Sequence, residues 1–188
     1  AAHRGRVEAR TFRLQYNLHA LRQLSDRKEP IVSTPPGPPE LERATRRALA
    51  VGLFNHVWTL LETPDRTVEQ DDEMVHAAHA SRYHWGEVGE KVNLARGEWQ
   101  CSRVYAVLGR AEPALHHAKR CIEINESNPD REDWDLASAY EAMARASAVA
   151  GDAAGSAEWR ARSRAELDRI ADPADREIIE GDLATLPV

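Results

Sequence analysis

The sequence lacks several features that would assign it to a class of protein directly. It has no run of 18 apolar residues and therefore no candidate membrane-spanning helix. It has only two cysteines, Cys101 and Cys121, and because 188 residues can bury a core without disulfides, we expect both to be buried free thiols. The net charge of −6 argues against nucleic-acid binding, which needs a basic surface that displaces counterions.

Catalytic signatures are also missing. The sequence contains no G-x-S-x-G nucleophile motif, no P-loop and no G-x-G-x-x-G dinucleotide-binding motif, which favours a non-enzymatic protein. Lysine occurs only at positions 28, 91 and 119, and the remaining basic residues are arginine, a usage typical of GC-rich bacterial genomes. The first residues lack the apolar segment of a signal peptide, so we expect a cytoplasmic location.

Prolines divide the chain near its N-terminal end. Residues 29–39 contain five prolines, which forbid a helix and favour an extended linker. Residues 1–28 are rich in arginine and carry apolar residues at helical spacing, which predicts a basic amphipathic helix or an N-terminal extension. Three roles stay open for residues 1–28: packing on the rest of the same chain, docking on a neighbouring copy, and an incidental extension.

Residues 40–188 carry a helical pattern throughout, and no segment alternates with period two. We expect Thr67 and Asn93 to be N-caps, and Gly109 to end a helix. The predicted helices span about 40–62, 67–85, 93–108, 112–125, 132–150, 153–170 and 173–186.

Two segments of this region share a spacing of small residues and a turn glycine. Small residues let two antiparallel helices approach closely, and glycine turns the chain sharply between them. The first segment has Ser102, Tyr105, Gly109, Ala114 and Cys121 at these positions. The second has Tyr140, Met143, Ala144, Gly151, Ser156 and Ser163.

This spacing resembles the tetratricopeptide motif over residues 92–167, although the two turn glycines are 42 positions apart and the motif repeats every 34. From residue 44 onward the chain also looks like a group of short bacterial proteins of unknown function. The resemblance implies an all-α fold of antiparallel helix pairs in a short right-handed solenoid. A helical bundle is the alternative fold.

The resemblance also implies a function, because helical repeats bind partners in the groove lined by the first helix of each repeat. On the helix at 93–108, Arg96, Gln100 and Arg103 form a polar stripe beside Trp99, and Asn93 lies one turn before it. Arginine binds carboxylates in a bidentate manner and tryptophan adds apolar contact area. We therefore expect a scaffold without a cofactor that binds a peptide or protein partner or forms a homo-oligomer. In the alternative interpretation, Arg96 and Arg103 pair with Glu98, Glu73 or Glu87, on the surface or between helices.

Histidines favour a different function. Asp72, His76 and His79 fall within an arc of about 60° on one predicted helix, and His56 on the preceding helix could add a nitrogen donor. Such donors suit zinc or iron, so the alternative is a small metal-binding protein or metal-dependent enzyme with a divalent metal. Local hydrogen bonding of these histidines is the competing explanation. We expect His117 to lie at the surface.

Overall fold

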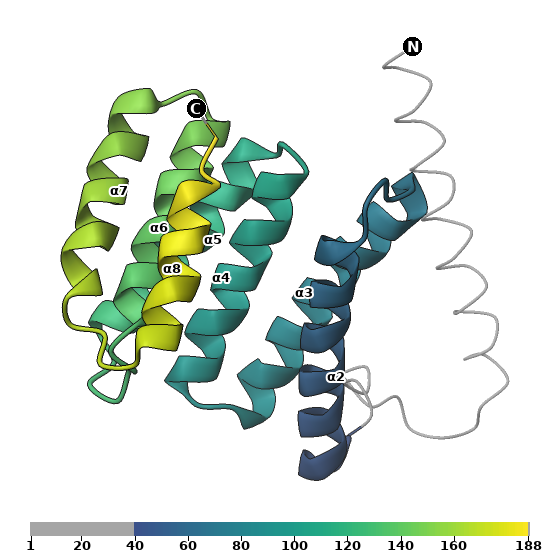
Figure 1. Cartoon of the computed structure of the whole chain (residues 1–188). Helices are drawn as coiled ribbons and strands as arrows, with labels where there is room; N and C mark the ends of the chain where they lie inside the picture. Colours follow the sequence, from purple (N-terminus) through teal and green to yellow (C-terminus); the bar gives the residue numbers. More distant parts are fainter. Residues whose placement is uncertain (1–39, 188) are drawn as a thin grey trace, which may run out of the picture. The chain divides into compact units, whose positions relative to one another are not determined.

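The computed structural model describes residues 40–187, and this part of the chain contains seven α-helices and no β-strand (Figure 1). All seven helices predicted beyond residue 40 are present, which confirms the all-α class. The predicted N-terminal helix at 1–28 and linker at 29–39 lie outside the described residues. The helices are α2 (Arg43–Glu62), α3 (Val68–Val88), α4 (Lys91–Val107), α5 (Ala111–Glu126), α6 (Asp135–Val149), α7 (Ala153–Leu167) and α8 (Pro173–Ala184).

The ends of α3 and α4 show how local side chains set helix boundaries. Thr67 is the N-cap of α3, as predicted: its hydroxyl accepts the Gln70 N–H at 3.3 Å, and the Gln70 side chain accepts the Thr67 N–H at 2.9 Å. The predicted N-cap Asn93 is wrong. Helix α4 begins three residues earlier, after Glu90, and the Asn93 carboxamide accepts the Glu90 N–H at 2.9 Å.

Glycines turn the chain after α4 and after α6. Gly109 has a φ of 67° and Gly151 a φ of 76°, both in the left-handed region that side chains disfavour. A third glycine, Gly97, lies where α4 crosses α3. A Cβ at that position would lie 2.7 Å from Cδ of Arg82, so glycine permits the close approach of these two helices.

Adjacent helices pack in an antiparallel arrangement, and a buried serine joins the two members of each pair. Three serines donate their hydroxyl hydrogen to a main-chain carbonyl of the partner helix. The bonds are Ser81 to Ala50 at 2.8 Å, Ser102 to Ala114 at 2.9 Å and Ser163 to Ala137 at 2.8 Å. The first bond joins α2 to α3, the second α4 to α5 and the third α6 to α7. The small residues predicted at the helix–helix contacts thus also tie the helices together.

The core consists of small clusters between neighbouring helices. One cluster fills the space between α2, α3 and α4 around Met74, and a second lies between α4, α5 and α6 around Met143. Cys101 and Cys121 are buried free thiols in these clusters, as predicted. None of the helices in the described region combines the length and apolarity needed to cross a bilayer.

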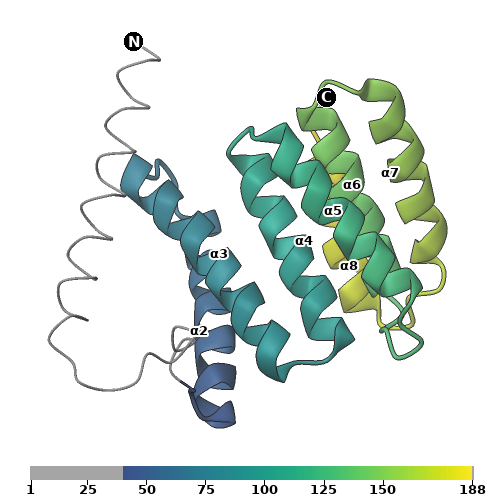
Figure 2. The same cartoon turned by 180° about the vertical axis from the view of Figure 1, so that it is seen from behind.

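The C-terminal helix α8 folds back onto the preceding helices. A third cluster, which includes Ile170, Ile179 and Leu183, packs α8 against α6 and α7. Figure 1 shows α8 in front of α6, and the opposite view in Figure 2 shows it behind α5 and α6. Helix α8 therefore lies on the face of the molecule that α4 and α6 share, opposite α5.

Candidate binding site

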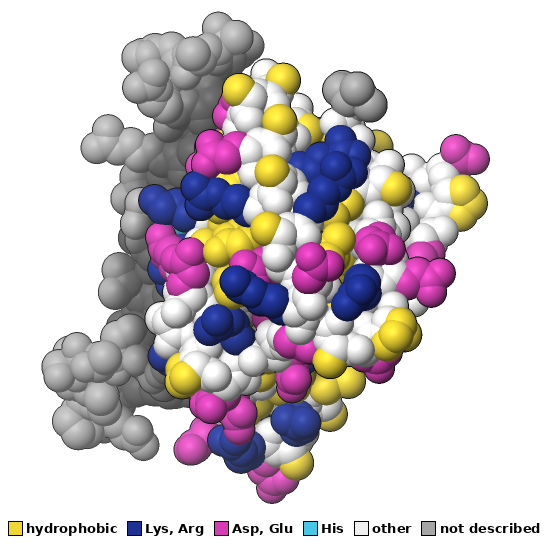
Figure 3. Space-filling view, turned by 60° about the vertical axis from the view of Figure 1, so that its left-hand side comes forward, with side chains coloured by type: hydrophobic (Ala, Val, Ile, Leu, Met, Phe, Trp, Pro, Cys, Tyr) yellow, Lys and Arg dark blue, Asp and Glu magenta, His cyan; other side chains and the backbone are white. Residues whose placement is uncertain are grey.

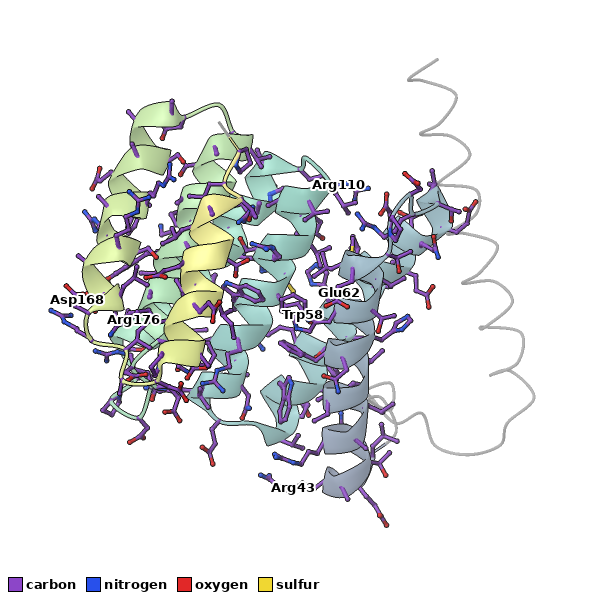
Figure 4. The ribbon with its side chains drawn as sticks, in the orientation of Figure 1. Arg43, Trp58, Glu62, Arg110, Asp168 and Arg176 are labelled. Atoms are coloured by element: carbon purple, nitrogen blue, oxygen red, sulfur yellow. The ribbon has the colours of Figure 1, made fainter. Side chains whose placement is uncertain are left out.

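A cavity of about 340 Å³ opens between α2, α4, α6 and α8, with part of its floor on α5. Its walls are largely apolar and aromatic, and they include Phe54, Trp58, Trp99, Trp134 and Ile178. Trp58 and Trp99 pack against each other with ring centroids 5.6 Å apart, and in Figure 4 Trp58 lies between α2 and α4. Ile178 keeps 62% of its surface exposed.

A second, smaller cavity continues the first along α2 and α4. It has a volume of about 130 Å³ and shares Phe54 and Arg96 with the larger cavity. Val51, Trp85 and Asn93 complete most of its lining. The two cavities are neighbours along α2 and α4, and we call them together the α2–α4 groove; α6 and α8 also line the larger cavity.

Polar groups in the larger cavity are few and mostly paired. Arg96 lies over the Trp134 ring at 4.2 Å and its Nε donates to Asp135 at 3.0 Å, while Asp182 pairs with Arg103 at 2.6 Å. Asp175 also lines the cavity, and no ion pair or hydrogen bond of its side chain occurs within residues 40–187. Among residues 40–187, this carboxylate is therefore a cavity charge without a partner.

Two buried polar atoms belong to residues that line the larger cavity and lack a hydrogen-bond partner in the described structure. They are Nε1 of Trp99, a donor, and Oδ1 of Asn125, an acceptor. Asn125 is only 2% exposed, and an unpaired polar atom at such depth costs free energy. Both atoms are buried within the wall of the cavity, so the surface that it offers to a ligand is mainly aromatic and apolar.

Three of the five residues predicted to bind a partner line the α2–α4 groove. Arg96 and Trp99 line the larger cavity, and Asn93 and Arg96 line the smaller one. Gln100 does not: it is 1% exposed and donates to the Phe54 carbonyl oxygen at 3.0 Å, which ties α4 to α2. Arg103 is also structural, because it bridges Glu141 on α6 at 3.3 Å and α8.

The acidic partners of these arginines lie far away in the sequence. Arg96 pairs with Asp135, which is 2% exposed, and Arg103 pairs with Glu141, which is 1% exposed. Burial raises the pKa of Glu141, although Arg145 and Arg103 act in the opposite direction. Both arginines therefore pair between helices, but not with Glu98, Glu73 or Glu87, the partners named in the alternative interpretation.

Arg145 completes a buried network that the sequence did not reveal. It lies on α6 one turn after Glu141, and it donates to the carbonyl oxygens of Asp182 at 2.8 Å and Thr185 at 3.1 Å. The spacing of Glu141 and Arg145 is that of an ordinary surface ion pair on a helix. The alanine-rich surroundings of the pair are the signal that this face of α6 is covered.

The four predicted metal ligands do not come together. His56 bonds to Glu73 on α3 at 2.9 Å, and His79 bonds to the Tyr105 hydroxyl at 2.8 Å. In the described part of the chain, the group of metal-binding side chains that does converge consists of His79, Cys101 and His117. His56, Asp72 and His76 are not members of this group.

The predicted surface position of His117 is wrong. Its side chain is only 14% exposed, and Nδ1 donates to Glu98 on α4 at 2.7 Å. A signal was available, because His117 lies three positions after Ala114 and four before Cys121, which are both buried on α5.

The sequence matches no model of a known protein family, and no curated protein matches it.

Proposed function

We propose that this chain is a helical-repeat module that binds a peptide segment of a partner protein in the α2–α4 groove. The observation that carries the proposal is the aromatic-walled cavity of about 340 Å³ in that groove. Ligand pockets span roughly 300–1,000 Å³, so this cavity is near the lower limit. It has room for one large apolar side chain, which would anchor an extended segment running along α2 and α4.

The repeat interpretation has its support in the pattern of helix contacts. We propose three tetratricopeptide-like pairs, α2/α3, α4/α5 and α6/α7, stacked as a short right-handed solenoid. The second helix of each pair packs against the first helix of the next pair, and the first helices of successive pairs also contact each other. Helices α2 and α3 contact neither α6 nor α8. A stack joined only to its nearest neighbours favours a solenoid over a closed bundle.

The negative charge of Asp175 at the cavity predicts a basic residue in the bound peptide. Among the described residues the Asp175 carboxylate at the cavity has no partner, so a lysine or arginine next to the apolar anchor would gain an ion pair. Charges of both signs are interspersed with apolar side chains over the face in Figure 3, so recognition would depend on such local pairs.

Selection from a random peptide display library tests the proposal, because the method requires no identified partner. We expect enriched peptides to contain an aromatic or large aliphatic anchor beside a basic residue. Asp175→Lys should shift the selected neighbour from basic to acidic, because the variant reverses the charge at the cavity.

The matched pair Ile178→Glu and Val68→Glu locates the binding site. Both residues are exposed, at 62% and 72%, but only Ile178 lines the cavity. Ile178→Glu should weaken binding of a selected peptide at least about tenfold, since it replaces apolar contact with a charge. Val68→Glu should leave affinity unchanged. Equal affinity of both variants and the parent protein would disprove the groove assignment.

A further inference from the structure

Three side chains with metal-binding atoms converge outside the α2–α4 groove. His79 on α3, Cys101 on α4 and His117 on α5 place one donor atom each within 4.8 Å of one another. The two imidazole rings have centroids 5.2 Å apart and are inclined by 62°. Each ligand comes from a different helix, so the backbones of three packed helices hold this arrangement.

The surrounding residues fix the orientation of both rings. The His117 Nδ1–H donates to the Glu98 carboxylate at 2.7 Å, so in the neutral imidazole Nε2 is the nitrogen that can bind a metal. Glu98 is 7% exposed and its other oxygen accepts from Arg82 at 2.9 Å. Tyr105 stacks on the His117 ring at 5.7 Å with an interplanar angle of 6°, and its hydroxyl bonds to His79. A carboxylate behind a histidine is the usual outer-shell partner of a metal-binding imidazole.

We propose that His79, Cys101 and His117 bind a divalent transition-metal ion of the zinc type, with Glu98 orienting His117. Two imidazoles and one thiolate are nitrogen and sulfur donors, which select zinc or cobalt over calcium or magnesium. On binding, the Cys101 thiol loses its proton to solvent and the thiolate forms the metal–sulfur bond.

The geometry requires a modest adjustment. Ligand atoms around a tetrahedral zinc lie about 3.5 Å apart, given bond lengths of roughly 2.0–2.3 Å. All three donors already lie within 4.8 Å of one another, so no pair has to close by more than about 1.3 Å. Three protein ligands leave the fourth tetrahedral position open to water.

Cobalt titration of the full-length protein, purified without chelator, tests the site directly. We expect one Co²⁺ per chain and a thiolate-to-cobalt charge-transfer band in the near ultraviolet. Zinc should displace the cobalt and raise the Tm by about 5–10 °C at a free concentration 100 times its Kd. Absence of cobalt binding, or binding without the thiolate band, would overturn the proposal.

Matched variants identify the ligands. Cys101→Ser should abolish the band, whereas Cys121→Ser, at the other buried cysteine, should retain it. His79→Gln should abolish binding, and His76→Gln, one turn away on the same helix, should retain it. Circular dichroism verifies that each variant is folded, and His79→Gln decides the result if Cys101→Ser does not fold. Loss of binding in His76→Gln, or its retention in His79→Gln, would contradict the proposed ligand set.

Discussion

Replacing Arg145 with methionine should release α8 from the face of α4 and α6. The Arg145 side chain is 9% exposed and pairs with Glu141 on its own helix at 2.6 Å. It also donates to the carbonyl oxygens of Asp182 and Thr185, the last polar groups of α8. A cation at this end of a helix interacts favourably with the helix dipole as well. One guanidinium therefore serves both a buried carboxylate and the C-terminal end of α8.

The structure sets the size of the effect. Methionine has nearly the same helix propensity as arginine, so the change isolates the guanidinium. Without it, Glu141 stays buried at 1% exposure with Arg103 as its remaining cation, at 3.3 Å. Removal of one partner from a buried ion pair costs about 3–5 kcal/mol. For a domain of this size, that loss lowers the Tm by about 6–20 °C.

Two measurements check this prediction. Thermal unfolding followed by circular dichroism gives the change in Tm, and amide hydrogen exchange should show α8 losing protection before α3. The matched control is Arg162→Met on α7, because Arg162 is 51% exposed and pairs with a glutamate that is 61% exposed. Exposed pairs contribute about 0–1 kcal/mol. An equal change in Tm for both variants would refute the argument that the Arg145 network holds α8.

Three further predictions concern the backbone, the thiols and pH. Gly151→Ala should destabilise the protein by about 1–2 kcal/mol, because Gly151 has a positive φ. Gly181→Ala within α8 should stabilise it by up to about 1 kcal/mol, because a Cβ at that position meets no other atom. Urea denaturation measures both changes. Cys101 and Cys121 should not react with Ellman's reagent in the native, metal-free protein. Burial raises the pKa of Cys101 to about 12 and raises that of Cys121 as well, so both stay protonated thiols. Both should react after unfolding in guanidinium. Burial raises the pKa of Glu98, but its hydrogen-bonded partners outweigh burial and hold the pKa below the usual 4.5. Its contribution to stability is therefore present above pH 4.5 and lost as the pH falls, and Glu98→Gln should flatten the decline of Tm below that pH.

The helices could be predicted from the sequence because their signals are local. Thr67 and the glycines at 109 and 151 each act within a few residues of the boundary that they set. The same locality explains the error at Asn93. A side chain that accepts a main-chain N–H favours both the N-cap and the third helical position, and in a capping box these positions differ by three residues.

Only the part of the groove that lies on α4 was predicted from the sequence. The spacing of Arg96 and Trp99 places both on the exposed side of α4, and both line the cavity. The opposite walls, Trp134 and Ile178, come from α6 and α8, and no local pattern connects them with α4. The acidic partners of the arginines are equally distant, with Asp135 lying 39 positions after Arg96. Contacts at this separation depend on how the pairs stack.

Of the four predicted metal ligands, only His79 belongs to the group that converges among the described residues, and the reason is geometric. Asp72 and His76 share a face of α3 with His79, but a metal site needs ligands that surround the ion, which one helix face does not supply. In antiparallel helices, residues at equal distances from the turn lie at the same height. Cys101 and His117 each lie eight positions from Gly109, and His79 and Cys101 lie ten and twelve positions from Gly89. Pairing residues at nearly equal distances from each of these two turns places His79, Cys101 and His117 next to one another.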